Sequence, residues 1–141
     1  MTQQEQKLPW HVLTVAILTL LWNGSGAYTI ILAQQGQLQG MRADEVEYYA
    51  SQALWFVIVT DIALFAPLAA AIALILRSGA AARLFALGLG AVLITNCYDL
   101  IAGSSRALAN PVAATVTGII IVIAILQLVY AMRMKKRGVL V

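Results

Sequence analysis

The sequence contains few charged residues for its length. Charged residues make up 11% of the 141 positions and hydrophobic residues make up 62%, whereas a soluble domain has roughly 25% charged residues. This composition excludes an ordinary soluble domain. One crossing of the bilayer takes roughly 20 apolar residues, so the length allows four crossings with short loops. We therefore expect a single membrane domain over residues 1–141.

Side chains that usually carry chemistry are also scarce. The single cysteine, Cys97, cannot form an intrachain disulfide, and the single histidine, His11, excludes a bis-histidine haem or a histidine-rich metal site supplied by this chain alone. The sequence shows no nucleophile paired with a base, no set of metal ligands and no phosphate-binding loop. We therefore expect no enzymatic activity, no cofactor and no bound metal.

Apolar stretches dominate what is present. They predict membrane-spanning helices over about residues 10–33, 44–77, 81–102 and 111–133. The first stretch begins after Pro9, and a loop rich in glycine and glutamine follows it. A cleaved signal peptide is the alternative for this stretch, although its basic region would contain only Lys7. The predicted fold class is all-α, an antiparallel bundle of four transmembrane helices.

Local signals indicate where these helices begin and end. Asp44 and Glu47 have the spacing of a capping box, which predicts the start of the second helix. That helix is longer than the hydrocarbon layer requires, so its first two turns are expected to stand in the headgroup region. Gly103 is expected to cap the third helix. Asn110 and Pro111 supply an N-cap and a first-turn proline for the fourth.

Basic residues are distributed unequally between the two sides of the membrane. With four spans both termini lie on one side, and seven of the nine lysines and arginines collect there: Lys7, Arg77, Arg83, Arg133, Lys135, Lys136 and Arg137. Arg42 and Arg106 lie on the opposite side. This asymmetry predicts that both termini are cytoplasmic. Because anionic lipid headgroups attract basic residues, the net charge of +3 requires no nucleic-acid partner.

Polar side chains within the apolar spans form the candidate site. Each would cost roughly 2 to 4 kcal/mol at mid-bilayer if it faced lipid, so we expect them to face inward. Asn23 and Asp61 lie roughly 15 Å from the outer boundary at a rise of 1.5 Å per residue, and Asn96 lies roughly 10 Å from it. Tyr28 and Asp99 are shallower. These five residues are the predicted binding residues.

Two interpretations of the polar residues remain open. They can line a small cavity open to the outer side, in which Asp61 binds a proton or a cation and the others form hydrogen bonds. Alternatively, they bridge the helices as structural hydrogen bonds, worth roughly 0.6 to 2 kcal/mol each. Near the basic end of the fourth span, Gln127 and Tyr130 are expected to be interfacial anchors.

Small residues recur at a spacing that predicts close helix packing. They are Ala66 and Ala70 in the second span, Ala82, Ala86 and Gly90 in the third, and Ala114 and Gly118 in the fourth. Pro67 has no amide hydrogen, so it leaves the carbonyl of Ala63 without its helical partner and is expected to bend the second span. The bend would either widen the cavity or fit the helix to its neighbours.

The first span contains the run Trp22, Asn23, Gly24, Ser25, Gly26, Ala27, Tyr28. With the glutamine-rich loop, the acidic, tyrosine-containing start of the second span, and Thr95, Asn96, Cys97 and Tyr98, it resembles a family of small four-span bacterial membrane proteins often labelled sugar transporters. The resemblance covers about residues 22–99 and implies a transport role in a bacterial inner membrane. That family usually has an Asp-Tyr pair where this chain has Thr29 and Ile30. A sugar site also normally has more carboxylates, amides and stacking aromatics than this interior.

The residues favour a non-catalytic accessory or assembly subunit of a membrane complex, because the chain is small, lacks cofactor ligands and has a uniformly apolar fourth span. The alternative is a small-solute or proton-coupled transporter working as an oligomer, which Asp61 and Asn23 at one depth favour. An enzyme has little support. The expected partners are the lipid bilayer and either other membrane chains or a second copy of this chain.

Overall fold

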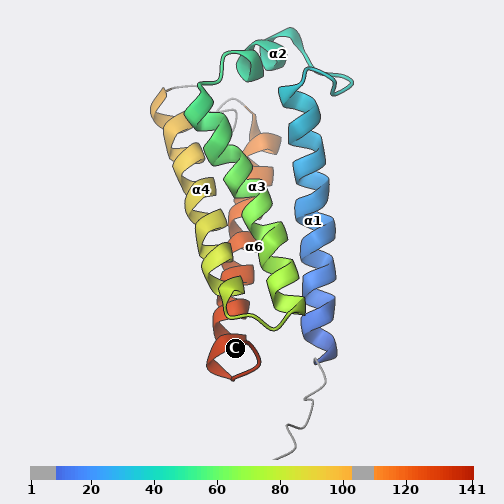
Figure 1. The fold of residues 1–141 in the computed structure, drawn as a ribbon. Coiled ribbons are helices and arrows are strands. Elements are labelled where there is room, and N and C mark those ends of the chain that lie inside the picture. The colour runs from blue at the N-terminus through green and yellow to red at the C-terminus, as the bar shows by residue number, and fades with distance from the viewer. Residues whose placement is uncertain (1–8, 103–109) are drawn as a thin grey trace, which may run out of the picture.

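The computed structural model describes residues 9–102 and 110–141, and its elements there are helices (Figure 1). They are α1 (Trp10–Gln34), α2 (Ala43–Ala50), α3 (Leu54–Ile75), α4 (Ala80–Ala102) and α6 (Pro111–Lys136). All except the short α2 are long and apolar enough to cross a membrane. The predicted fold, an antiparallel bundle of four transmembrane helices, is confirmed.

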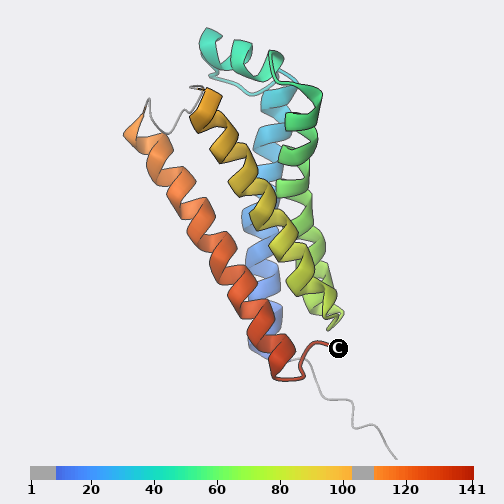
Figure 2. The same ribbon diagram turned by 90° about the vertical axis from the view of Figure 1, so that its left-hand side faces the viewer.

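The four long helices pack unevenly. α3 packs against α1 on one side and against α4 on the other, and α6 packs along α4. Figure 2 shows α6 inclined away from the other helices toward the end of the bundle that carries α2. Over the described residues, α1 and α6 make no comparably close contact. The bundle therefore has three close interfaces and one loose side.

The expectation of one long second helix is wrong, because the chain forms two helices, α2 and α3, with residues 51–53 between them. α2 begins after Arg42, whose backbone N–H donates to Oε2 of Glu45 at 3.0 Å. Glu45 therefore caps this helix, rather than the predicted pair of Asp44 and Glu47. The physical reason for the break is polarity, since α2 has acidic residues in its first turn and no buried residue. Such a helix is better hydrated lying across the end of the bundle, as Figure 1 shows, than extending a span.

The other helices match their predicted ranges to within a few residues. Asn110 caps α6 as predicted, because its Oδ1 accepts a hydrogen bond from the N–H of Val112 at 2.8 Å and Pro111 is the first helical residue. The polar run at residues 23–26 does not interrupt α1. Gly103, the predicted cap of the third span, lies outside the described residues.

The hydrophobic core lies at the end where α3 joins α4. It contains Val12 and Ala16 of α1, Ala70, Ala73 and Leu74 of α3, Ala81, Ala82 and Phe85 of α4, Ala131 and Met134 of α6, and Leu140. Leu140 belongs to a docked segment, residues 139–141, that lies against the α3–α4 turn. The N–H of Val141 donates to the carbonyl of Arg77 at 2.7 Å, and the N–H of Gly79 donates to the backbone oxygen of Val141 at 2.6 Å. These bonds fix the segment after α6 to the turn.

Close packing of small residues is confirmed for only part of the predicted set. Ala66, Ala70 and Ala82 are buried, whereas Ala86, Gly90, Ala114 and Gly118 are not. The closest approach of α3 and α4 instead involves Gly88, where an added Cβ would lie 2.9 Å from both Cγ and Cδ of Pro67. The buried ring of Pro67 therefore lies closely against α4, while the bend expected at Pro67 stays a prediction.

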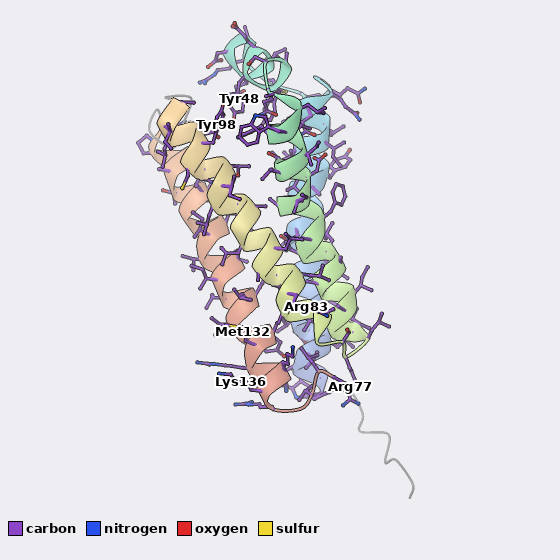
Figure 3. All side chains as sticks on the ribbon, turned by 60° about the vertical axis from the view of Figure 1, so that its left-hand side comes forward. Tyr48, Arg77, Arg83, Tyr98, Met132 and Lys136 are labelled. Atoms are coloured by element: carbon purple, nitrogen blue, oxygen red, sulfur yellow. The ribbon has the colours of Figure 1, made fainter. Side chains whose placement is uncertain are left out.

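Charge separates the two ends of the bundle. Figure 3 shows Arg77, Arg83 and Lys136 toward one end and Tyr48 and Tyr98 toward the other. We call these the basic end and the α2 end. The last turn of α6 adds further basic residues to the basic end. The expected gathering of basic residues on one side is confirmed for the described residues, while Lys7 and Arg106 lie outside them.

Candidate functional site

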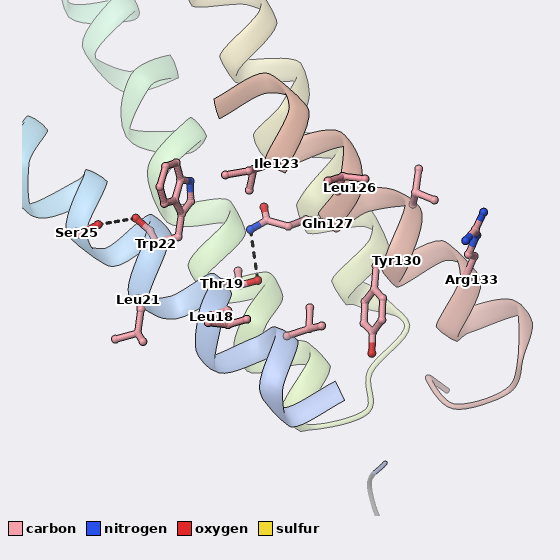
Figure 4. Close-up of a pocket in the computed structure, with 12 residues that line it drawn as sticks. Leu18, Thr19, Leu21, Trp22, Ser25, Ile123, Leu126, Gln127, Tyr130 and Arg133 are labelled. Atoms are coloured by element: carbon pink, nitrogen blue, oxygen red, sulfur yellow. Dashed lines mark hydrogen bonds between the residues drawn. The ribbon is translucent and has the colours of Figure 1, made fainter. Parts of the chain in front are cut away.

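The loose side of the bundle contains a lateral groove between α1 and α6, which we call the seam groove. It has a volume of about 770 Å³ and is lined by residues between 15 and 25 of α1 and between 123 and 133 of α6 (Figure 4). Its lining is mainly apolar, and Leu18, Leu21 and Leu126 are exposed. Because these side chains lie at membrane depth, the groove opens onto the hydrocarbon of the bilayer.

Two polar side chains lie in this groove and are buried. Thr19 and Gln127 are 2% and 8% exposed, and Nε2 of Gln127 donates to Oγ1 of Thr19 at 3.3 Å (Figure 4). The prediction of Gln127 as an interfacial anchor is wrong, because its side chain turns inward and bonds α1. Thr19 was not predictable from the sequence, because a threonine in an apolar helix can satisfy its hydroxyl by bonding its own backbone.

A second hydrogen bond joins the same two helices at the basic end. Nδ1 of His11 lies 2.7 Å from the hydroxyl oxygen of Tyr130, and the two rings meet edge to face with centroids 6.2 Å apart. Tyr130 therefore fixes the spacing of α1 and α6, a role beyond the predicted interfacial anchor. The helices are tied at the basic end by this bond and by the Thr19–Gln127 bond, whereas α6 inclines away toward the α2 end.

A smaller inner cavity of about 360 Å³ lies among all four long helices. Asn23 of α1, Pro67 of α3, Gly88 of α4 and Gln127 of α6 contribute to its wall, and most of the remaining lining is apolar. The cavity shares several wall residues with the seam groove, Gln127 among them. The two hollows are therefore neighbours across one layer of side chains.

The five predicted binding residues occupy different surroundings. Asn23 lines the inner cavity and donates through Nδ2 to the carbonyl of Thr19 at 3.0 Å, one turn earlier in its own helix. Asn96 likewise donates to the carbonyl of Val92 at 2.8 Å. Tyr28 is 68% exposed and lines neither hollow. The side-chain amide nitrogens of Asn23 and Asn96 thus donate to carbonyls of their own helices.

Asp61 has no hydrogen-bond partner for its buried Oδ1 among the residues that the structure describes. The neighbouring Thr60 has a buried hydroxyl in the same condition. Asp61 is half-buried and does not line the seam groove or the inner cavity. A buried oxygen without a hydrogen bond costs free energy in an apolar layer, so Asp61 is an energetically costly polar residue within α3.

Asp99 lies at the α2 end, where it holds α2 against α4. The hydroxyl of Tyr48 donates to Oδ2 of Asp99 at 3.0 Å, and a hollow of about 260 Å³ lies beside the pair. The ring of Tyr98 packs edge to face on Trp55, with centroids 4.8 Å apart.

Burial raises the pKa of Tyr48 above its ordinary value of 10.0, and the nearby carboxylate of Asp99 raises this pKa further. The sequence did not indicate Tyr48 because the two partners are 51 residues apart.

Comparison of the chain with protein-family models, with curated proteins and with solved structures finds no match. The resemblance of residues 22–99 to a family of four-span proteins therefore stays a prediction. Within the described residues, no three His, Cys, Asp or Glu side chains are close enough together to hold a metal ion. The seam groove and the inner cavity are both mainly apolar hollows between the spanning helices.

Proposed function

We propose that this protein is a non-catalytic subunit of a membrane complex that contacts a partner chain through α6. The observation that carries the proposal is the exposure of α6. Only 6% of its most apolar stretch is buried, compared with 33% for α3. α6 packs along α4 and inclines away from α1 toward the α2 end. Most of its surface is therefore available to a neighbour.

The residues on α6 support a packing contact. Ala114 and Gly118 are exposed one turn apart, and a Cβ added to Gly118 would meet no atom within 4 Å. Small residues at this spacing let two helix backbones approach closely, and packing of this kind drives helix association in membranes. The partner is accordingly an apolar membrane helix, supplied by another protein.

Photo-crosslinking in intact membranes tests this proposal. A photoreactive amino acid at Gly118 should give a discrete adduct with one other membrane protein, which should also copurify with the wild-type chain in mild detergent. The same amino acid at Ile72, an exposed position on α3, is the matched control and should give no such adduct. An adduct between two copies of this chain would replace the subunit function with self-association. Adducts with lipid alone at both positions would contradict the proposal.

A proton-coupled or small-solute transporter is the second candidate, favoured by the unpaired buried oxygen of Asp61. Asp61→Asn tests it, because the amide keeps the shape of the carboxyl group but cannot change charge. If Asp61 only bridges helices, the variant should keep its stability within about 1 kcal/mol and leave cell function unchanged. If Asp61 carries a proton, the variant should fold normally yet lose pH-dependent uptake. The apolar linings of the two hollows offer a polar solute few contacts.

We also propose that the basic end faces the cytoplasm of a bacterial inner membrane. The support is the excess of lysine and arginine in and beside the α3–α4 turn and in the last turn of α6, since cytoplasmic loops carry such an excess. Both termini are then cytoplasmic.

A further inference from the structure

One face of α6 presents a cation, a hydroxyl and then apolar surface, in that order. Arg133, Tyr130, Leu126 and Ile123 follow one another at intervals of three, four and three residues, so they form one row along the helix. All four line the seam groove, and Figure 4 shows them along α6. The row runs from the basic end to about 15 Å deeper, at 1.5 Å per residue. The groove is therefore cationic at the basic end and apolar within the membrane.

Arg133 has no paired carboxylate within residues 9–102 and 110–141. Among these residues no aspartate or glutamate lines the seam groove. Lys136 follows three residues later, and it lies at the basic end in Figure 3. An anionic group at the mouth of the groove would therefore meet uncompensated positive charge, at the depth where lipid phosphates lie.

We propose that the seam groove binds one anionic phospholipid, with its phosphate at Arg133 and one acyl chain lying along the groove. A phospholipid has the same order of groups as the row on α6, with a charged phosphate followed by hydrocarbon. The volume of about 770 Å³ lies within the usual range for a ligand site.

Trp22 of α1 lines the seam groove, so its fluorescence can report on a lipid bound there. Trp10 and Trp55 are replaced by phenylalanine, so that Trp22 is the sole tryptophan. The protein is placed in phosphatidylcholine vesicles that contain a small fraction of phosphatidylglycerol brominated on its acyl chains. Bromine quenches tryptophan on contact. Trp22 should be quenched more by brominated phosphatidylglycerol than by the same fraction of brominated phosphatidylcholine. Equal quenching by the two lipids would reveal bulk bilayer contact alone and overturn the proposal.

Variants of one residue then locate the phosphate. Arg133→Gln should weaken the apparent association of the anionic lipid about fivefold, in line with the contribution of one basic residue at a membrane surface, and Arg133→Lys should retain most of it. Arg83→Gln is the matched control, because it makes the same chemical change at the basic end on α4 (Figure 3) and Arg83 does not line the groove. Undiminished selectivity in Arg133→Gln, or an equal loss in Arg83→Gln, would overturn the proposed site.

Discussion

The ring of Pro67 lies against the α-carbon of Gly88, so closely that a Cβ on Gly88 would stand 2.9 Å from two ring carbons. Pro67 costs α3 one backbone hydrogen bond, because it offers no N–H to the carbonyl of Ala63. The absence of a side chain at Gly88 gives the ring its space. The two residues also share the wall of the inner cavity, so the α3–α4 contact and the cavity depend on the same pair.

We expect Gly88→Ala to destabilise the protein by about 1 to 3 kcal/mol, because the added methyl group forces α3 and α4 apart. This loss should appear although alanine favours a helix more than glycine does. Gly90→Ala is the matched control, since a Cβ there meets no atom within 4 Å, and it should be neutral or slightly stabilising. Thermal unfolding in detergent compares the two. Equal stability of the two variants would show that the Pro67 contact does not constrain the bundle.

The docking of α2 should weaken at high pH. The pKa of Tyr48 is raised by burial and by Asp99, so the folded protein keeps this proton at a pH where an unfolded chain has lost it. The stability due to Tyr48 is therefore complete below pH 10.0 and decreases as the pH rises above that value. Absorbance at 295 nm should show a tyrosine that ionises late. Burial also raises the pKa of the neighbouring Tyr49, so Tyr48→Phe should reduce this late component rather than remove it, and a titration unchanged by that substitution would contradict the assignment.

The docked segment should contribute measurably to stability. Leu140 is buried in the core, so Leu140→Ala should lower the free energy of unfolding by about 2 to 5 kcal/mol. Val141→Ala is the matched control, because that side chain is 92% exposed and its backbone bonds to the α3–α4 turn are retained. Chemical unfolding in detergent measures both. A Leu140→Ala protein as stable as Val141→Ala would mean that the segment is not docked in solution.

Cysteine labelling checks the orientation. Cys97 is first replaced by serine, and single cysteines are placed at Ser78 in the α3–α4 turn and at Gln37 in the α1–α2 loop. In intact cells a membrane-impermeant thiol reagent should reach only the cysteine at Gln37, because the basic end faces the cytoplasm. Permeabilised cells should show labelling at both positions. Labelling at Ser78 from outside intact cells would reverse the proposed topology.

The long helices were predictable because each depends on a property of one continuous stretch. A span requires a run of apolar residues, and the cap of α6 requires only the neighbours Asn110 and Pro111. The break between α2 and α3 was missed for the opposite reason. A capping signal is followed by a continuous helical pattern there, and the partner that holds α2 in place is Asp99, on another helix.

The candidate site was predictable only as a set of residue types. Depth counted along a helix places Asn23 and Asp61 in one layer, but it does not say which way each side chain turns. Asn23 turns to a carbonyl of its own helix, and Gln127 turns inward to Thr19, which is 108 residues away in the chain. These side-chain directions depend on the inclination of α6 relative to α1, which local sequence patterns do not specify.

The position of the core also has a consequence for biosynthesis. Val12 and Ala16 of α1 are among the first core residues to leave the ribosome, while Leu140, which packs in the same cluster, is made only after α6. α1 can pack against α3 as soon as α3 is made, but the part of the core that Ala131, Met134 and Leu140 complete stays open to lipid until almost the whole described chain has been translated. This exposure to lipid costs little free energy, because lipid tails are as apolar as the alanine and valine side chains concerned. Small apolar core residues on α1 therefore suit a chain in which the first and last segments pack together only late in synthesis.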